Sequence, residues 1–159
     1  MNDTTRSAVR HRYAETAIQK TALAFGIVFA LVGIAGFIPG LTTNVDTMQF
    51  AGHESEALLL GIFQVSILHN IVHLLFGVAG LAAAATARAS RLYLLVGGVI
   101  YLVLWLYGLF VAGSDMGGNF VPLNSADNWL HLVLGIAMVL LGFLVGRDRA
   151  TTTGRAGRV

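Results

Sequence analysis

The chain has 159 residues, of which 56% are hydrophobic and only 11% are charged. Soluble globular proteins carry about 25% charged residues, and this composition excludes a disordered chain, a collagen-like chain and a coiled coil. Cysteine is absent, which excludes disulfides, thiolate zinc sites and cysteine-ligated iron–sulfur clusters. Length and composition together predict one small integral membrane domain.

Four apolar segments are long enough to cross a bilayer, which takes about 20 residues of helix. Within a membrane domain covering 21–146, we expect helices at about 21–38, 67–86, 92–112 and 126–146. Asp127 is the one charged residue inside these segments. None of them alternates with period two, as outer-membrane strands would. We therefore predict an all-α fold, a bundle of four transmembrane helices.

The basic residues are confined to one side of this predicted bundle. All ten lie before the first helix, between the second and third, or after the fourth: Arg6, Arg10, Arg12, Lys20, Arg88, Arg91, Arg147, Arg149, Arg155 and Arg158. The other two loops, about 39–66 and 113–125, contain no Lys or Arg. The positive-inside rule then predicts a multi-pass protein of the cell membrane, with a cytoplasmic N-terminal segment 1–20 and a cytoplasmic tail 147–159. Charges at helix ends indicate contact with anionic lipid, so the expected partner is the bilayer and not nucleic acid.

Two parts of the chain are similar to each other. Residues 65–79 match residues 123–137 at a shift of 58, with Asn, His, Leu, Gly and Ala in common. The first and third helices match more weakly at a shift of 71, which pairs Gly26 with Gly97. Copies of a two-helix unit insert with the same orientation. We therefore predict two tandem helical hairpins, whose second helices present like faces to each other.

The shared pattern Asn-x-x-His-Leu-x-x-Gly opens the second and fourth helices. Its polar residues are His69, Asn70 and His73 in the first copy, and Asp127, Asn128 and His131 in the second. In this doubled motif, over about residues 20–146, the chain resembles a bacterial membrane-protein family catalogued as domain of unknown function 4383. The resemblance implies a four-helix membrane protein and implies no reaction.

Ser66 and Asn124 occupy equivalent places directly before the second and fourth helices. Both residue types are preferred N-caps; the family that the chain resembles is expected to have Asn where this chain has Ser66. Asp127 follows Asn124 by three residues, where a carboxylate favours the positive helix end and completes a capping box. We expect Asp127 to have this structural role.

The Asn and His of each motif are three residues apart, so they share a helix face. At a rise of 1.5 Å per residue, both histidines lie roughly 10 Å inside the start of the helix. Gly77 and Gly135 continue the same faces, and such small residues let helices approach closely. One hypothesis is a pseudo-symmetric polar clamp near the outer face that orders the bundle. The protein would then be non-enzymatic, acting as a homodimer or as an accessory subunit of a membrane complex.

The alternative hypothesis is a ligand site, because ionisable residues inside a membrane are rare. His69 and His73 are one turn apart and could share a divalent metal such as zinc with His131 and Asp127. His73 and His131 could instead ligate one haem, or the cluster could bind a quinone, a lipid or a small solute, or relay protons. A small transporter is a second alternative, disfavoured because no helix is interrupted midway. No arrangement of residues supports hydrolysis, which favours a non-enzymatic role without deciding it.

The remaining aromatic and small residues of the helices are expected to have packing roles. Most members of one aromatic group should face lipid or anchor the interface: Tyr93, Tyr101, Trp105, Tyr107 and Trp129. Gly26, Ala30 and Gly33 form a small-residue face on the first helix, suited to close helix contact.

Overall fold

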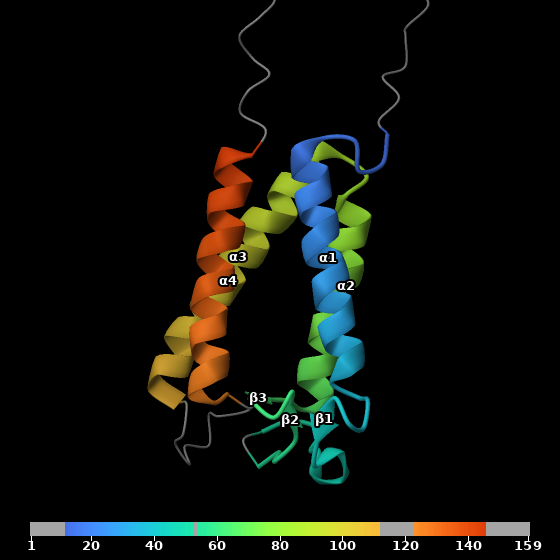
Figure 1. Cartoon of the computed structure of the whole chain (residues 1–159). Coiled ribbons are helices and arrows are strands. Elements are labelled where there is room, and N and C mark those ends of the chain that lie inside the picture. Colours follow the sequence, from blue (N-terminus) through green and yellow to red (C-terminus); the bar gives the residue numbers. More distant parts are fainter. Residues whose placement is uncertain (1–11, 53, 112–122, 146–159) are drawn as a thin grey trace, which may run out of the picture.

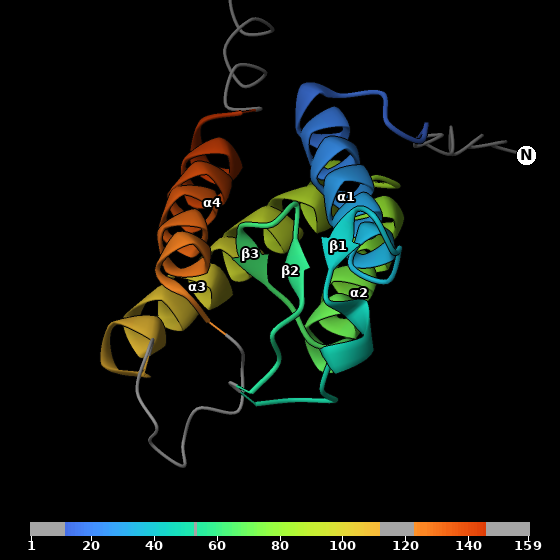
Figure 2. The same ribbon diagram turned by 60° about the horizontal axis from the view of Figure 1, so that its bottom comes forward.

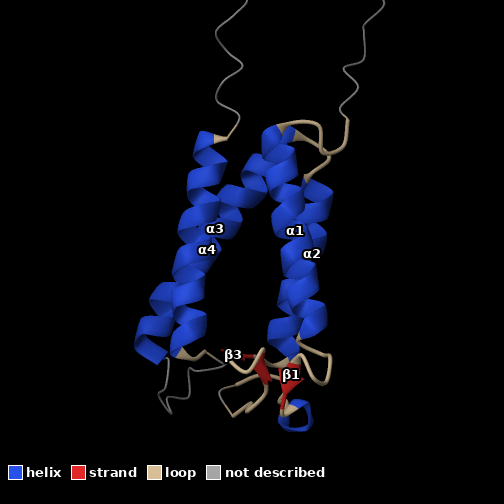
Figure 3. Cartoon of the chain, in the orientation of Figure 1, coloured by secondary structure: helices blue, strands red, loops and turns tan. Residues whose placement is uncertain are grey.

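A computed structural model describes residues 12–52, 54–111 and 123–145. Most of these residues belong to four helices: α1 Ala17–Ala35, α2 Ile67–Ala83, α3 Ala87–Val111 and α4 Ser125–Leu144. A small sheet lies at one end of the helices (Figures 1 and 3). The prediction of a four-helix fold is confirmed. The expected tail 147–159, most of the loop 113–125 and the first part of the segment 1–20 lie outside the described residues.

Three of the helices, α1, α3 and α4, are long and apolar enough to cross a membrane. The apolar helix α2 is shorter, with 17 residues. Its C-terminal end lies level with the start of α1, because the Ala84 carbonyl accepts hydrogen bonds from the Ala14 N–H at 3.1 Å and from Gln19 Nε2 at 2.9 Å. α2 therefore runs antiparallel beside α1 over nearly the same height (Figure 1).

α1 begins at Ala17, earlier than the expected start at residue 21. A capping box explains the difference. The Thr16 N–H donates to Gln19 Oε1 at 2.9 Å, and the Gln19 N–H donates to Thr16 Oγ1 at 3.4 Å. These bonds satisfy backbone donors that would otherwise lack partners, so Lys20 lies inside the helix and not before it.

α3 likewise begins at Ala87, ahead of the expected residue 92. The Thr86 hydroxyl accepts the Ala89 N–H at 3.1 Å, which is the bond that an N-cap makes. Arg88 and Arg91 therefore belong to the first two turns of α3. The expectation that they lie in a loop is wrong, although they stay at the end of the bundle where it placed them.

The helices pack as two pairs, α1 with α2 and α3 with α4 (Figure 1). Glycines bring the backbones close within each pair. A Cβ added at Gly26 would lie 3.0 Å from the Gly77 carbonyl oxygen, and one added at Gly98 would lie 2.9 Å from that of Gly135. The expectation that α2 and α4 turn like faces to each other is therefore wrong, because their small residues face the first helix of their own pair.

The segment between α1 and α2 is a compact cap and not an open loop. It contains strands β1 Thr42–Thr43, β2 Leu58–Leu59 and β3 Phe63–Gln64, which form an antiparallel sheet in that order. A short 3-10 helix, η1 Val45–Thr47, lies between β1 and β2. Figure 2 shows β3 on the side of the sheet nearer α3 and α4. The cap therefore belongs to the first helix pair in sequence and reaches toward the second in space.

The outer surface of the bundle is apolar while several polar side chains are buried. Leu75, Phe110 and Val133 are 62%, 74% and 62% exposed. The buried polar residues within the helices are Gln19, Asn70, Ser90, Asp127, Asn128 and His131. Soluble proteins rarely expose large continuous apolar surfaces, whereas a helix bundle in lipid turns its polar side chains inward.

Candidate functional site

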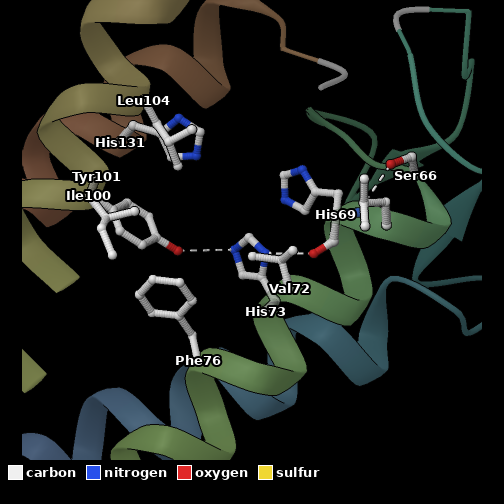
Figure 4. A pocket seen from close by; sticks show the side chains of 10 residues that line it. Ser66, His69, Val72, His73, Phe76, Ile100, Tyr101, Leu104 and His131 are labelled. Carbon is white, nitrogen blue, oxygen red and sulfur yellow. Dashed lines mark hydrogen bonds between the residues drawn. The ribbon is translucent and has the colours of Figure 1, made fainter. Parts of the chain in front are cut away.

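A cavity of about 240 Å³ lies between α2, α3 and α4, at the end of the bundle nearest the sheet. Figure 4 shows it from close by. Its polar residues are His69 and His73 from α2, Tyr101 from α3 and His131 from α4, together with Ser66. The rest of the wall is apolar. The three histidines singled out in the sequence thus line one cavity.

His73 links the two helix pairs. Its Nδ1 lies 3.1 Å from the His69 carbonyl oxygen, and because a carbonyl only accepts, Nδ1 carries the proton. Nε2 is then left with a lone pair, which the Tyr101 hydroxyl approaches at 3.5 Å and to which it donates. Tyr101 is 3% exposed. The expectation of a lipid-facing residue is wrong for Tyr101, because its side of α3 packs against α1 and α2.

The aromatic contacts around the histidines occur in two matching sets. The His73 ring stands edge-on to Phe29 of α1, with 5.8 Å between ring centroids. The His131 ring stands edge-on to Tyr101 of α3 at 5.2 Å. Phe29 and Tyr101 stack on each other at 5.4 Å. In each pair, a histidine of the second helix therefore packs against an aromatic ring of the first helix.

The two motif asparagines also make matching contacts. A Cβ built at Gly36, just after α1, would collide with Asn70 Oδ1, and one at Gly108 of α3 would collide with Asn128 Oδ1. Neither amide oxygen has a hydrogen-bond partner among the described residues. Each faces the Cα hydrogen of its glycine, an arrangement typical of weak Cα–H···O contacts. The amides therefore close the end of their own helix pair and do not form a clamp between α2 and α4.

Gly36 and Gly108 were not among the residues predicted for the site. They are 72 residues apart, as are Phe29 and Tyr101. The alignment of the first and third helices at a shift of 71 therefore differs by one residue from the structural equivalence. At a shift of 72, the glycines opposite the two asparagines would have been visible in the sequence.

Asp127 holds the start of α4 against the cap. Its N–H donates to Asn124 Oδ1 at 3.0 Å, and its Oδ2 accepts the Asn124 N–H at 3.1 Å, which completes a capping box. The same Oδ2 accepts the Gln64 N–H of β3 at 3.0 Å. Asn124 Nδ2 adds a bond to the Ile62 carbonyl at 2.6 Å. The carboxylate thus serves backbone donors of α4 and β3.

His69 lies at the start of α2, where its N–H donates to the N-cap oxygen Ser66 Oγ at 3.1 Å. Its ring stacks on that of His73, with 4.4 Å between centroids and planes only 3° apart. Imidazole lone pairs lie in the ring plane. Two parallel stacked rings therefore direct their lone pairs side by side, and not toward one point.

The predicted metal site stays a prediction, and the geometry of the described residues does not favour it. Over residues 12–52, 54–111 and 123–145, no three His, Asp or Glu side chains are grouped so that they could hold a metal ion. His69 and His73 are stacked, His73 uses both nitrogens within the fold, and Asp127 is bound to backbone. A haem between His73 and His131 fits no better, since both ring nitrogens of His73 are engaged within the fold and neither is left to ligate iron.

Comparison with known proteins identifies a family and no individual relative. The family model described as Domain of unknown function (DUF4383) matches residues 19–144. A search of the curated proteins gave no match, and a search of the solved structures gave none either.

Proposed function

We propose that this chain, which belongs to the family described as Domain of unknown function (DUF4383), is a non-enzymatic, multi-pass membrane protein that acts by association. Hydrogen bonds from polar side chains of its core and cap hold the two helical hairpins together. Its apolar outer surface contacts lipid and the helices of a partner, either a second copy or a membrane complex to which it is an accessory subunit.

The observation that carries this proposal is that polar groups of the core bind other parts of the same chain. Several hydrogen bonds between described residues connect the pair α1–α2 and its cap to the pair α3–α4. Asn124 Nδ2 donates to the Ile62 carbonyl at 2.6 Å, and the Ser90 hydroxyl donates to the Ala83 carbonyl at 2.9 Å. The Tyr93 hydroxyl donates to the Phe76 carbonyl at 3.1 Å, the Tyr101 hydroxyl lies 3.5 Å from His73 Nε2, and the Gln64 N–H donates to Asp127 at 3.0 Å. Hydrogen bonds between membrane helices contribute about 0.6–2 kcal/mol each.

We propose further that all four helices span the membrane and that both termini are cytoplasmic. The 17 residues of α2 extend about 26 Å at 1.5 Å per residue, against a hydrocarbon core of about 30 Å, and α2 lies beside α1. Basic residues of the described chain lie near the starts of α1 and α3: Arg12, Lys20, Arg88 and Arg91. Acidic residues of the cap lie toward the opposite end: Asp46, Glu54 and Glu56. This asymmetry supports the orientation that the positive-inside rule predicts.

The matching contacts support an origin by duplication of one hairpin. Gly36 and Asn70 in the first pair correspond to Gly108 and Asn128 in the second, and the histidine–aromatic contacts correspond likewise. Tandem copies of a two-helix unit are related by an axis along the membrane normal. The continuous helices α1 to α4 do not favour a transporter, since many transporters bind substrate at interrupted helices.

A stability measurement tests the structural role of the cluster. His73→Phe keeps a ring against Phe29 and removes the hydrogen bonds to Tyr101 and to the His69 carbonyl. We expect a loss of about 1–2 kcal/mol, seen as a thermal midpoint about 2–8 °C lower in detergent micelles. Tyr101→Phe should lower it by less, and the double variant by less than the sum. Trp129→Phe, at a side chain 63% exposed, is the control; wild-type midpoints for both cluster variants would refute the role.

Association is measured separately. Native mass spectrometry of the full chain, released from membranes with its lipid, reports the oligomeric state and any stable partner. The proposal expects a dimer or a defined complex. Cross-linking in intact membranes, from single cysteines introduced on the exposed face of each helix, is the check. The proposal would be contradicted if the chain formed cross-links neither to a second copy nor to another membrane protein.

A further inference from the structure

Two imidazoles in the cavity have no hydrogen-bond partner in the part of the chain that is described. Nδ1 of His131 is buried without one, and the His131 side chain is 5% exposed. The ring of His69 stacks on His73 and takes part in no hydrogen bond there. In Figure 4 the rings of His69 and His131 lie on opposite sides of the same cavity. Buried polar groups are normally paired, so His131 points to a ligand. His69 is only half-buried, and its ring offers a second polar group at the same cavity.

The wall of the cavity restricts the chemistry of that ligand. Among the described residues that line it there is no Lys, Arg, Asp or Glu, so a phosphate or carboxylate head group would find no countercharge. Phe76 and Tyr101 supply flat aromatic surfaces. A neutral imidazole carries one donor and one acceptor. Two imidazoles on opposite sides therefore suit an uncharged, flat head group with a polar atom at each of two opposite edges.

A second cavity shows where an apolar tail would lie. This groove of about 510 Å³ runs between α2 and α3 and shares Phe76 and Ile100 with the first cavity. Its wall is almost entirely apolar, and at its edges Leu75 and Leu92 are each 62% exposed. Because these residues lie on the outer surface, the groove opens toward the lipid. A membrane-soluble molecule would enter sideways from the bilayer.

From these observations we propose that the chain binds a quinone lipid between its two helix pairs. The two ring carbonyl oxygens accept hydrogen bonds from His69 and His131, the ring lies against Phe76 and Tyr101, and the hydrocarbon tail occupies the groove along α2 and α3. This binding role goes beyond the structural role proposed above. It uses His69 and His131, whose rings the structural role leaves without a hydrogen-bond partner among the described residues. It involves no transfer of electrons.

Calorimetric titration of the full chain in nanodiscs made of quinone-free lipid tests the proposal. The probe is a 1,4-benzoquinone that carries a ten-carbon alkyl chain, and the control compound is benzene that carries the same chain. We expect saturable binding of one quinone per chain, at least about tenfold tighter than that of the control compound, since two hydrogen bonds are lost in the control.

Variants locate the head group. His69→Phe and His131→Phe each remove one hydrogen bond and keep a flat ring, so each should weaken binding of the quinone about 3- to 10-fold and leave binding of the control compound unchanged. His131→Phe also removes an unpartnered polar atom, so the protein should remain folded. Trp129 lies on the same helix as His131 and its side chain is exposed. The control variant Trp129→Phe should therefore bind the quinone like the wild type.

Three results would overturn the proposal: absence of quinone binding, equal affinity for both compounds, or wild-type affinity in both histidine variants. Equal affinity would mean that only the alkyl chain is recognised. These outcomes do not depend on the thermal test of His73→Phe. A protein that fails to bind quinone can therefore still have the structural role. The reverse outcome, quinone binding with wild-type stability of His73→Phe, would remove the structural role alone.

Discussion

The contact between Gly36 and Asn70 can be tested with two substitutions. Gly36→Ala adds a methyl group at the contact, and Asn70→Ala makes space for it. Gly36 is the C-cap of α1 with φ −59° and ψ −20°, a conformation that alanine adopts without strain. A Cβ there would collide with the Asn70 amide, since Oδ1, Cγ and Nδ2 all lie within reach of it. Asn70 is 1% exposed, so its side chain has no room to turn away.

The magnitude follows from two opposing effects. Overpacking of a filled interior costs about 1–3 kcal/mol, whereas glycine-to-alanine at a compatible backbone conformation stabilises by about 0.4–1 kcal/mol when space is available. Gly36→Ala should therefore lower the free energy of unfolding by about 1–2 kcal/mol. In an Asn70→Ala background, where the methyl group has space, the same change should be stabilising.

Thermal unfolding in detergent micelles measures both backgrounds. Gly36→Ala should lower the midpoint by about 2–8 °C, and it should raise the midpoint when added to Asn70→Ala. Val78→Ala, which trims a side chain 63% exposed, serves as a control with little expected effect. The reasoning would be refuted if Gly36→Ala had the same effect with and without Asn70, because the collision would then not be its cause.

Other substitutions test the remaining contacts, by the same unfolding assay for Gly98, Gly97 and Ser66 and by hydrogen exchange for Asp127. Gly98→Ala would set its Cβ 2.9 Å from two backbone atoms, Gly135 O and Val139 N, and should cost about 1–3 kcal/mol; the neighbouring Gly97→Ala meets the flexible end of Met138 at 2.6 Å and should cost less. Similar losses from both would contradict the close approach of α3 and α4. Asp127→Ala removes the acceptor of two backbone N–H groups and should increase hydrogen exchange at the Gln64 amide, while Asp127→Asn, which keeps an oxygen, should have a smaller effect. Unchanged exchange in Asp127→Ala would argue against the link to β3. Ser66→Ala should cost about 0.5–2 kcal/mol through loss of the cap on α2; no loss would mean that this cap is dispensable.

Local chemistry made much of the fold predictable. The apolar segments are long enough to identify the helices, and the side chains of Ser66 and Asn124 cap α2 and α4. The starts of α1 and α3 were placed too late because hydrophobicity outweighed the caps at Thr16 and Thr86. The strands of the cap have two residues each, which is too short for an alternating pattern to be recognised.

The candidate site was predictable only in part. The repeat placed His73 and His131 at one depth, with His69 one turn earlier, and all three line one cavity. Their neighbours were missed for a physical reason. A helix in lipid is apolar on both its outer and its inner face, so the side that Tyr101 occupies cannot be read from hydrophobicity.

The four-span topology depends most on α2, which is the shortest of the four helices. Because the chain has no cysteine, single cysteines can be placed on either side of α2 without further changes. Thr43→Cys lies in β1 and Ala85→Cys lies just after α2, and both positions are exposed. In intact cells, a membrane-impermeant maleimide should label Thr43→Cys, and should label Ala85→Cys only after the membrane is permeabilised. Labelling of both positions from the same side would show that α2 does not cross the membrane and would contradict the account.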